Sequence, residues 1–165
     1  MVKKVTTATT IGLNAYEIDV EVDFVHSLPN ISIVGLPDIA INEAKERVRS
    51  AVKNSGFTFP ALRVIVNLAP ADLRKEGTNF DLPIAIGILI ENGFIEEEKT
   101  KTTAFLGELS LDGTLRGVNG ILPLVSGLKE FGLKSVIVPL PNAEEAALVE
   151  GIEVYGAQRL EDVVN

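Results

Sequence analysis

The sequence contains no cysteine, no tryptophan and a single histidine, and aromatic residues make up only 5% of it. Without cysteine the chain can form neither a disulfide nor a thiolate metal site, so a cytoplasmic location is expected. A zinc or other transition-metal site is not expected either, because His26 is the only imidazole, and we interpret it as a surface loop residue. The scarcity of aromatics leaves the core to be built from Val, Ile, Leu and Ala.

Long apolar runs and nucleotide-binding loops are also missing. No run approaches the roughly 18 uncharged apolar residues of a membrane span, and the first residues lack the apolar stretch of a signal peptide, so no membrane contact is expected. None of the 14 glycines is followed by lysine, and no G-x-G-x-x-G occurs. We therefore expect no nucleotide and no other cofactor to bind this stretch of chain through either standard loop.

The charge balance is acidic. The formal net charge of −8 opposes nucleic acid binding by the domain as a whole, because affinity for phosphates comes mainly from neutralising their charge. A local basic patch remains compatible with that total. At 165 residues, with 46% hydrophobic and 23% charged residues, the chain is expected to form a single globular domain, residues 1–165.

The first half of the chain predicts antiparallel strands and one helix. Residues 3–13 and 16–25 are predicted to form a hairpin, and apolar and acidic residues alternate strictly from Tyr16 to Asp23, which indicates one buried and one wet face. A strand at 30–34 precedes a helix from Ile39 to Asn54 that Asp38 caps. Strand 63–68 follows, and a nearly all-apolar helix is expected from about Pro83 to Asn92.

Strands and helices alternate in the second half. Strand 103–109, a hairpin return at 114–116, helix 121–131, strand 135–138, helix 143–149, strand 153–155 and a last turn at 160–164 are expected. Antiparallel strands followed by alternating strands and helices predict an α+β or α/β sandwich.

The loop between strand 63–68 and the apolar helix concentrates charged residues. Its three carboxylates, Asp72, Glu76 and Asp81, could act as acid and base or hold Mg²⁺, although capping and salt bridges are the commoner roles of such groups. Its two cations, Arg74 and Lys75, could pair with those carboxylates or face a partner. The same loop holds Gly77.

A second charged feature lies on the helix at 39–54. Lys45, Arg49 and Lys53 recur every four residues and so share one face, which is either a solvated surface or a contact for phosphate or an acidic partner. Glu43 and Arg47 have the spacing of an intrahelical ion pair.

Several segments together resemble one family. They are IVGLP at 33–37, ERVRSA at 46–51, VNLAPADL at 66–73, KEG at 75–77, FDLPIA at 80–85 and LGEL at 106–109. They resemble the N-terminal domain of the magnesium chelatase-like AAA+ ATPases, over about residues 6–164. The resemblance implies that an AAA+ module, with its ATP and Mg²⁺, lies downstream of this domain. It also implies a homo-hexamer when the protein is full length, and a role for some members in DNA branch migration during natural transformation.

The resemblance further implies a fold like that of the proteolytic domain of Lon, a βαβ sandwich with a left-handed crossover. Lon-type proteases use a serine nucleophile and a lysine base. Matching of the K-E-G loop places Asn79 where the serine would stand, and matching of the G-E-L strand places Leu122 where the lysine would stand. An amide cannot attack a peptide and leucine cannot accept a proton, so the resemblance implies a fold without protease activity.

Three hypotheses follow for function. The first is a non-catalytic accessory domain of a hexameric AAA+ motor that serves assembly or substrate contact, with Lys45, Arg49, Lys53, Arg74 and Lys75 as the candidate contact surface for DNA or for the ATPase module. The second is a residual hydrolase that uses the loop carboxylates. The third is a freestanding nucleic-acid-binding module.

Overall fold

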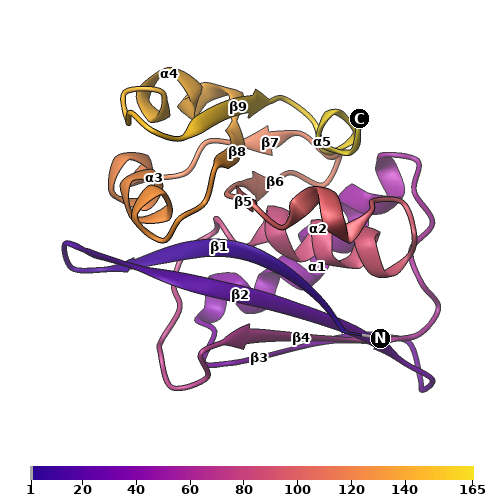
Figure 1. The fold of residues 1–165 in the computed structure, drawn as a ribbon. Helices are drawn as coiled ribbons and strands as arrows, with labels where there is room; N and C mark the ends of the chain where they lie inside the picture. Colours follow the sequence, from indigo (N-terminus) through magenta and orange to yellow (C-terminus); the bar gives the residue numbers. More distant parts are fainter. Residues whose placement is uncertain (1) are drawn as a thin grey trace.

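The computed structural model describes residues 2–165 and shows a seven-stranded sheet with helices on both faces (Figure 1). The strand order is β3-β4-β2-β1-β5-β8-β9. β2 pairs antiparallel with both of its neighbours, and every other pairing in this sheet is parallel. The predicted mixed α/β sandwich is therefore confirmed.

The elements have the following bounds. The strands of the main sheet are β1 (Lys3–Ile11), β2 (Asn14–Val25), β3 (Asn30–Val34), β4 (Arg63–Ala69), β5 (Thr103–Phe105), β8 (Ser135–Pro139) and β9 (Glu153–Ala157). A separate two-stranded ribbon contains β6 (Glu108–Leu109) and β7 (Leu115–Arg116). The α-helices are α1 (Ile39–Asn54), α2 (Asp81–Glu91), α3 (Ile121–Glu130), α4 (Ala143–Ala146) and α5 (Leu160–Val164), and short 3₁₀ turns are η1 (Glu97–Thr100) and η2 (Leu140–Asn142).

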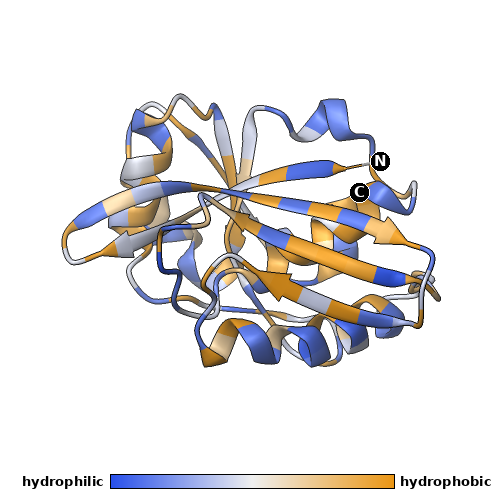
Figure 2. Ribbon diagram, turned by 90° about the horizontal axis from the view of Figure 1, so that it is seen from below, coloured by the Kyte–Doolittle hydropathy of each residue, from blue (hydrophilic) through white to orange (hydrophobic). Residues whose placement is uncertain are grey.

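The β1–β2 hairpin follows the alternation in its sequence. Ile18, Val20 and Val22 are fully buried, and the acidic residues between them lie on the opposite face. The same alternation is visible along the strands in Figure 2, where polar and apolar residues follow one another. The predicted hairpin with one wet face is confirmed.

A βαβ unit joins β3, α1 and β4. β3 and β4 are adjacent and parallel, so the chain must cross over between them, and α1 makes that connection. α1 begins as predicted, because the Asp38 Oδ1 accepts a hydrogen bond from the Ile41 N–H at 2.8 Å. Its buried residues face α2, with which it lies side by side (Figure 1).

α2 begins two residues earlier than the sequence predicts. It starts at Asp81, so Leu82 is helical although it precedes Pro83. Proline lacks only an N–H that has no intrahelical partner in the first turn, and the Leu82 N–H donates to the Gly107 carbonyl at 3.0 Å instead. This tertiary bond holds Leu82 in a conformation that the following proline disfavours. Residues 81–90 are all buried, as the apolar sequence indicates.

The second half differs from prediction in two places. The expected strand 103–109 is divided into β5 and β6, because the chain leaves the main sheet at Leu106 and Gly107 and β6 pairs with β7 instead. The expected helix 143–149 ends at Ala146. The hairpin return predicted at 114–116 is confirmed by β7.

The two faces of the hairpin are covered by different helices. A Cβ on Gly87 of α2 would lie 2.5 Å from the Val22 Cγ2, and a Cβ on Gly127 of α3 would lie 2.4 Å from the Ala15 Cβ. Since Val22 and Ala15 are an odd number of residues apart on β2, they point to opposite faces, so α2 covers the apolar face and α3 covers the other face only near the turn. Two apolar clusters result, one around α1 and α2 and one around α3 and α4. No helix within residues 2–165 is long and apolar enough to span a bilayer.

Candidate functional site

The loop between β4 and α2 buries one of its two cations. Lys75 is fully buried, and its Nζ donates to the Gly35 carbonyl at 2.7 Å and to the Pro70 carbonyl. Burial lowers the pKa of Lys75, and the charge of Asp72 opposes this shift. Lys75 was expected on an exposed contact surface, and its burial removes it from that surface.

Lys75 also ties two loops together through its backbone. Its N–H donates to the Leu36 carbonyl and its carbonyl accepts from the Asp38 N–H, both at 3.1 Å. The Asp38 Oδ2 accepts from the Gly77 N–H at 3.0 Å, so the cap of α1 serves both loops. The β3–α1 and β4–α2 loops therefore form one hydrogen-bonded unit around the buried ammonium group.

The β3–α1 loop, to which Lys75 is hydrogen-bonded, has a constrained backbone. Gly35 has a φ of +103°, and a Cβ there would lie 2.2 Å from the Leu68 carbonyl oxygen, so only glycine fits. Leu36 follows with a φ of +56°, a conformation that non-glycine residues rarely adopt, and its side chain is 51% exposed. This accounts physically for the G-L-P sequence at 35–37.

The second buried charge of the loop belongs to Asp81. Its Oδ2 accepts from the Arg47 Nε at 2.7 Å and from the Leu109 N–H at 3.0 Å, and its Oδ1 accepts from the Arg47 Nη2 at 3.0 Å. Burial raises the pKa of Asp81, and the hydrogen bonds from Arg47 and Leu109 oppose that shift. The hydrogen bond to Asp81 in turn raises the pKa of Arg47. The ion pair therefore links α1, α2 and β6.

Sequence reasoning did not find this ion pair. It paired Arg47 with Glu43 on the same helix, whereas the guanidinium group contacts Asp81 and Glu43 acts on it only at longer range. The available signal was a lone carboxylate at the head of ten residues that are otherwise apolar. A charge in that position needs a partner from another element.

The three loop carboxylates do not converge on one site. Asp72 and Glu76 are exposed, whereas Asp81 is buried against Arg47. Among residues 2–165, no group of three or more His, Asp or Glu side chains is placed to hold a metal ion. The structure therefore does not bring the three carboxylates together as one metal site, and Asp81 forms a salt bridge, the commoner role of such groups.

The remaining candidate cations lie on the molecular surface. Lys53 and Arg74 are exposed, and Lys45 and Arg49 are partly buried. The Arg49 guanidinium lies 5.8 Å from the centre of the Phe59 ring and its Nη1 lies 3.5 Å from the Glu46 Oε1. Arg49 and Lys53 border a small cavity of about 340 Å³. The proposed basic face of α1 thus exists, with Arg49 partly engaged by its neighbours.

Asn79, at the position expected for a nucleophile, borders a cavity of about 390 Å³. Its Nδ2 donates to the Ala8 carbonyl at 2.9 Å, and its backbone carbonyl accepts from the Gly107 N–H at 3.2 Å. From α3 the cavity is lined by Leu124, whereas Leu122, at the position expected for the base, is partly buried and does not line it. Asn79 therefore contributes an amide to the lining of this cavity, and Leu122 contributes nothing.

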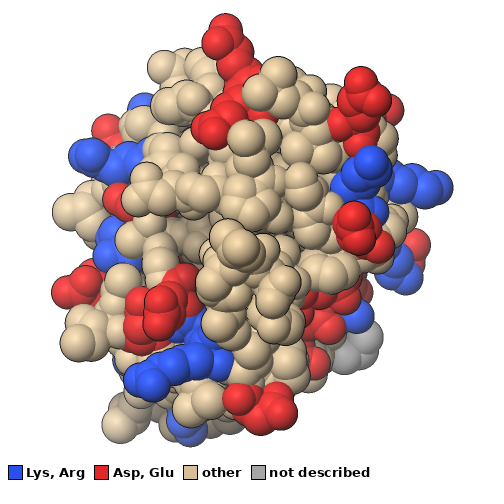
Figure 3. Space-filling model, turned by 90° about the vertical axis from the view of Figure 1, so that its left-hand side faces the viewer, with Lys and Arg blue, Asp and Glu red and all other residues tan. Residues whose placement is uncertain are grey.

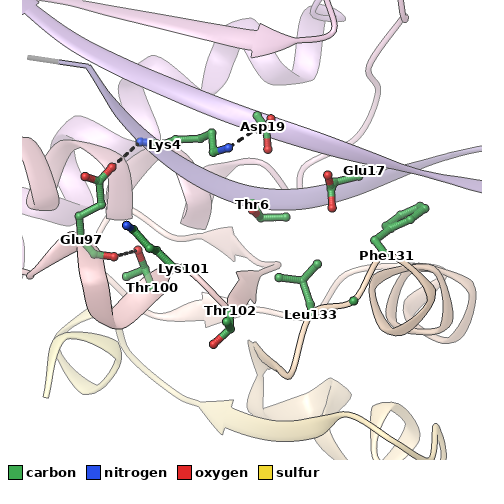
Figure 4. Close-up of a pocket in the computed structure, with 11 residues that line it drawn as sticks. Lys4, Thr6, Glu17, Asp19, Glu97, Thr100, Lys101, Thr102, Phe131 and Leu133 are labelled. Atoms are coloured by element: carbon green, nitrogen blue, oxygen red, sulfur yellow. Dashed lines mark hydrogen bonds and ion pairs between the residues drawn. The ribbon is translucent and has the colours of Figure 1, made fainter.

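A third cavity, of about 380 Å³, lies between the hairpin, η1 and the end of α3 (Figure 4). Its charged groups are engaged within the fold. The Lys4 Nζ lies 3.9 Å from the Asp19 Oδ2, and the Lys4 backbone N–H donates to the Glu97 Oε2 at 3.1 Å. Burial and the neighbouring Asp19 raise the pKa of Glu17. Because the lining mixes both signs of charge, this cavity offers no matched set of ligands for a metal ion or a phosphate.

The hydrogen bonds that the Lys75 ammonium group donates to the Gly35 and Pro70 carbonyls, here called the Lys75 clamp, can be tested by removing that group. Lys75→Met leaves the Gly35 and Pro70 carbonyls without their partner, and we expect a loss of about 2–4 kcal/mol in the free energy of unfolding in urea. Arg74→Met, a matched change at the exposed neighbour, should alter it by no more than about 0.5 kcal/mol. Equal effects of the two substitutions would contradict the clamp.

The same variant tests the direction of the pKa shift. The folded-state pKa of Lys75 lies below its ordinary value of 10.5, so between these two values the unfolded chain binds more protons. Stability from Lys75 should therefore rise with pH through this window, and the difference between wild type and Lys75→Met should widen in urea titrations towards pH 10.5. A difference that shrinks would show that the folded state favours the charged amine.

Comparisons with known proteins place this geometry in a family. The family described as subunit ChlI of Mg-chelatase matches residues 20–142. The chain is 44% identical over 155 residues to competence protein ComM of Haemophilus influenzae, which covers 94% of this chain and 30% of ComM. It is 42% identical over 159 residues to the uncharacterized protein YifB of Escherichia coli, which covers 96% of this chain and 31% of YifB.

A more distant similarity reaches Lon proteases. Lon protease 2 of Bacillus subtilis is 26% identical over 122 residues, which cover 73% of this chain and 21% of that protease. The chain spans about a third of the length of ComM and YifB, so these relatives contain much more than the fold described above. From the match over residues 20–142 and the similarity to ComM and YifB, the chain belongs to the Mg-chelatase subunit ChlI-like family.

Proposed function

We propose that this chain is a non-catalytic N-terminal accessory domain of a hexameric magnesium chelatase-like AAA+ ATPase. Its family membership supports the proposal, as does the length of its relatives, of which it spans about 30%. In this proposal ATP and Mg²⁺ bind to an AAA+ module outside these 165 residues, and that module is the principal partner of the domain. The location is cytoplasmic.

The observation that carries the non-catalytic role is the use of the loop's polar groups within the fold. Asn79 donates its amide to the Ala8 carbonyl, Lys75 holds two carbonyls, and Asp81 is paired with Arg47. Proteolysis by a Lon-type dyad requires a hydroxyl beside an amine. Asn79 and Leu122 supply neither, so the loop is a scaffold that has kept its shape without that chemistry.

The role of the whole protein is proposed to be DNA branch migration of the competence type, carried out by the full-length hexamer. The name of ComM refers to competence, which supports this part of the proposal. The net charge of −8 argues against DNA binding by this domain on its own. Contact with DNA or with the ATPase module is proposed to use Lys45, Arg49, Lys53 and Arg74.

Two other functions make different predictions. A residual hydrolase would have to use the exposed Asp72 or Glu76, because Asp81 is buried against Arg47. A freestanding nucleic-acid-binding module would show affinity that falls steeply with salt, since phosphate contacts release counterions.

The absence of proteolysis can be tested on the chain itself. Incubation with unfolded casein and with fluorogenic peptides should release no fragments, whereas Lon protease 2 of Bacillus subtilis with ATP should cleave casein as the positive control. Cleavage that survives purification and disappears in Asp72→Ala or Glu76→Ala would establish the hydrolase and overturn the proposal.

The accessory role is tested on the product of the complete gene. With ATP it should assemble as a hexamer by light scattering and migrate branched DNA, and removal of residues 1–165 should reduce assembly or migration. Lys53→Glu and Arg74→Glu, at two of the proposed contact residues, should weaken hexamer assembly or branch migration. Lys134→Glu, at an exposed lysine outside the proposed contact residues, is the control. Undiminished assembly and migration without residues 1–165 would contradict the proposal.

A further inference from the structure

β1 has a strand partner along its whole length on one side only. It pairs with β2 from Lys3 to Ile11, but with β5 at the single position Thr6↔Ala104. β5 ends at Phe105, and the Gly107 N–H then donates to the Asn79 carbonyl, so a residue of the β4–α2 loop follows β5. Within residues 2–165, no strand therefore covers the outer side of β1 from Thr7 to Ile11.

The backbone groups of this segment point into the uncovered side. The Ala8 carbonyl points there, because it accepts a hydrogen bond from the Asn79 side chain. The Asn79 backbone carbonyl in turn accepts a hydrogen bond from the Gly107 N–H. The N–H and C=O groups of alternate residues in a strand point the same way, so those of Thr10 point there too. No backbone hydrogen bond from a described loop reaches Thr10. Asn79 thus takes the place of a strand at Ala8, and the edge is open beyond it.

The open edge borders the cavity of about 390 Å³. Thr9 and Thr10 form its β1 wall, and Val118, Asn119 and Leu124 line it as well. A cavity of this volume is within the range of ligand-binding sites. A strand needs about 4.8 Å beside its neighbour and about 3.3 Å per residue along its length, so a segment of a few extended residues is the matching occupant.

The charges around the cavity discriminate between possible occupants. Its lining contains the carboxylates of Asp38 and Glu76 and no lysine or arginine. Phosphate groups would meet negative charge there, and the domain as a whole is acidic. In Figure 3, which views the side to which the β1–β2 hairpin projects, charged side chains lie mainly around the rim and the centre of the face carries few. A neutral or basic polypeptide fits both a cavity lined by carboxylates and a face with few charged side chains at its centre.

We propose that the open edge of β1 and the adjoining cavity bind an extended, neutral or basic polypeptide segment by strand addition. The backbone of that segment pairs with Thr10, and its apolar side chains contact Val118 and Leu124. Main-chain pairing of this kind supplies affinity without a strict sequence requirement. The inference deepens the proposed accessory function, on which it rests, by naming polypeptide as the class of partner that this site contacts.

The test uses a short fluorescein-labelled peptide of alternating Thr and Val with lysines near its ends, followed by fluorescence anisotropy on the chain. Three matched probes accompany it, namely the same peptide N-methylated at alternate amides, the same peptide with Glu for Lys, and single-stranded DNA. We expect the unmodified basic peptide to bind at least about tenfold more tightly than each of them, because N-methylation removes the paired N–H groups. Equal binding of the N-methylated peptide, or preference for DNA, would overturn the proposal.

Variants at Thr10 locate the site. Thr10→Pro removes the outward N–H and should weaken peptide binding about tenfold, whereas Thr10→Val keeps the N–H and should bind as wild type. The midpoint of urea unfolding checks that both variants fold. If Thr10→Pro does not fold, the comparison of the unmodified and N-methylated peptides on the wild-type chain decides whether strand addition occurs. Absence of peptide binding by a chain that supports normal hexamer assembly would overturn this inference alone, whereas loss of any effect of residues 1–165 on assembly or migration would overturn the proposed function.

Discussion

The buried carboxylate of Asp81 is the constraint on which the central part of the fold depends. It lies at the start of α2, whose residues 81–90 are all buried, and burial of an unpaired charge at such a position costs several kcal/mol. Arg47 of α1 and the Leu109 amide of β6 together satisfy it. The position of α1 against α2, and the path of the chain after β5, are therefore linked to one side chain.

A second buried charge extends this arrangement to the loops. Lys75 brings the β3–α1 and β4–α2 loops together by donating to a carbonyl of each. The loop that holds the candidate site thus uses two of its five charged side chains, Lys75 and Asp81, to define its shape, whereas Asp72, Arg74 and Glu76 are exposed. The loop also borders the cavity beside Asn79, next to the open edge of β1.

Much of this fold follows from local sequence patterns. Alternation along 16–23 predicted the hairpin and its wet face, and Asp38 predicted the start of α1, because both depend on residues that are close in sequence. The partner of Asp81, the burial of Lys75 and the division of strand 103–109 depend on contacts between distant segments. A lysine in a polar loop carries no local signal of burial, since the carbonyls that receive it belong to Gly35, forty residues earlier, and to Pro70. The cavity beside Asn79 was likewise visible only once β1 and α3 were in place.

The central claim is that the buried charges of this loop are structural, and a double-mutant cycle on Arg47 and Asp81 tests it most directly. Arg47→Met, Asp81→Asn and the double variant would be compared with wild type by urea unfolding. We predict that each single substitution costs about 3 kcal/mol, because each leaves a partner uncompensated, and that the double variant costs clearly less than the sum of the two. Additive effects, or single substitutions that leave stability unchanged, would contradict the account.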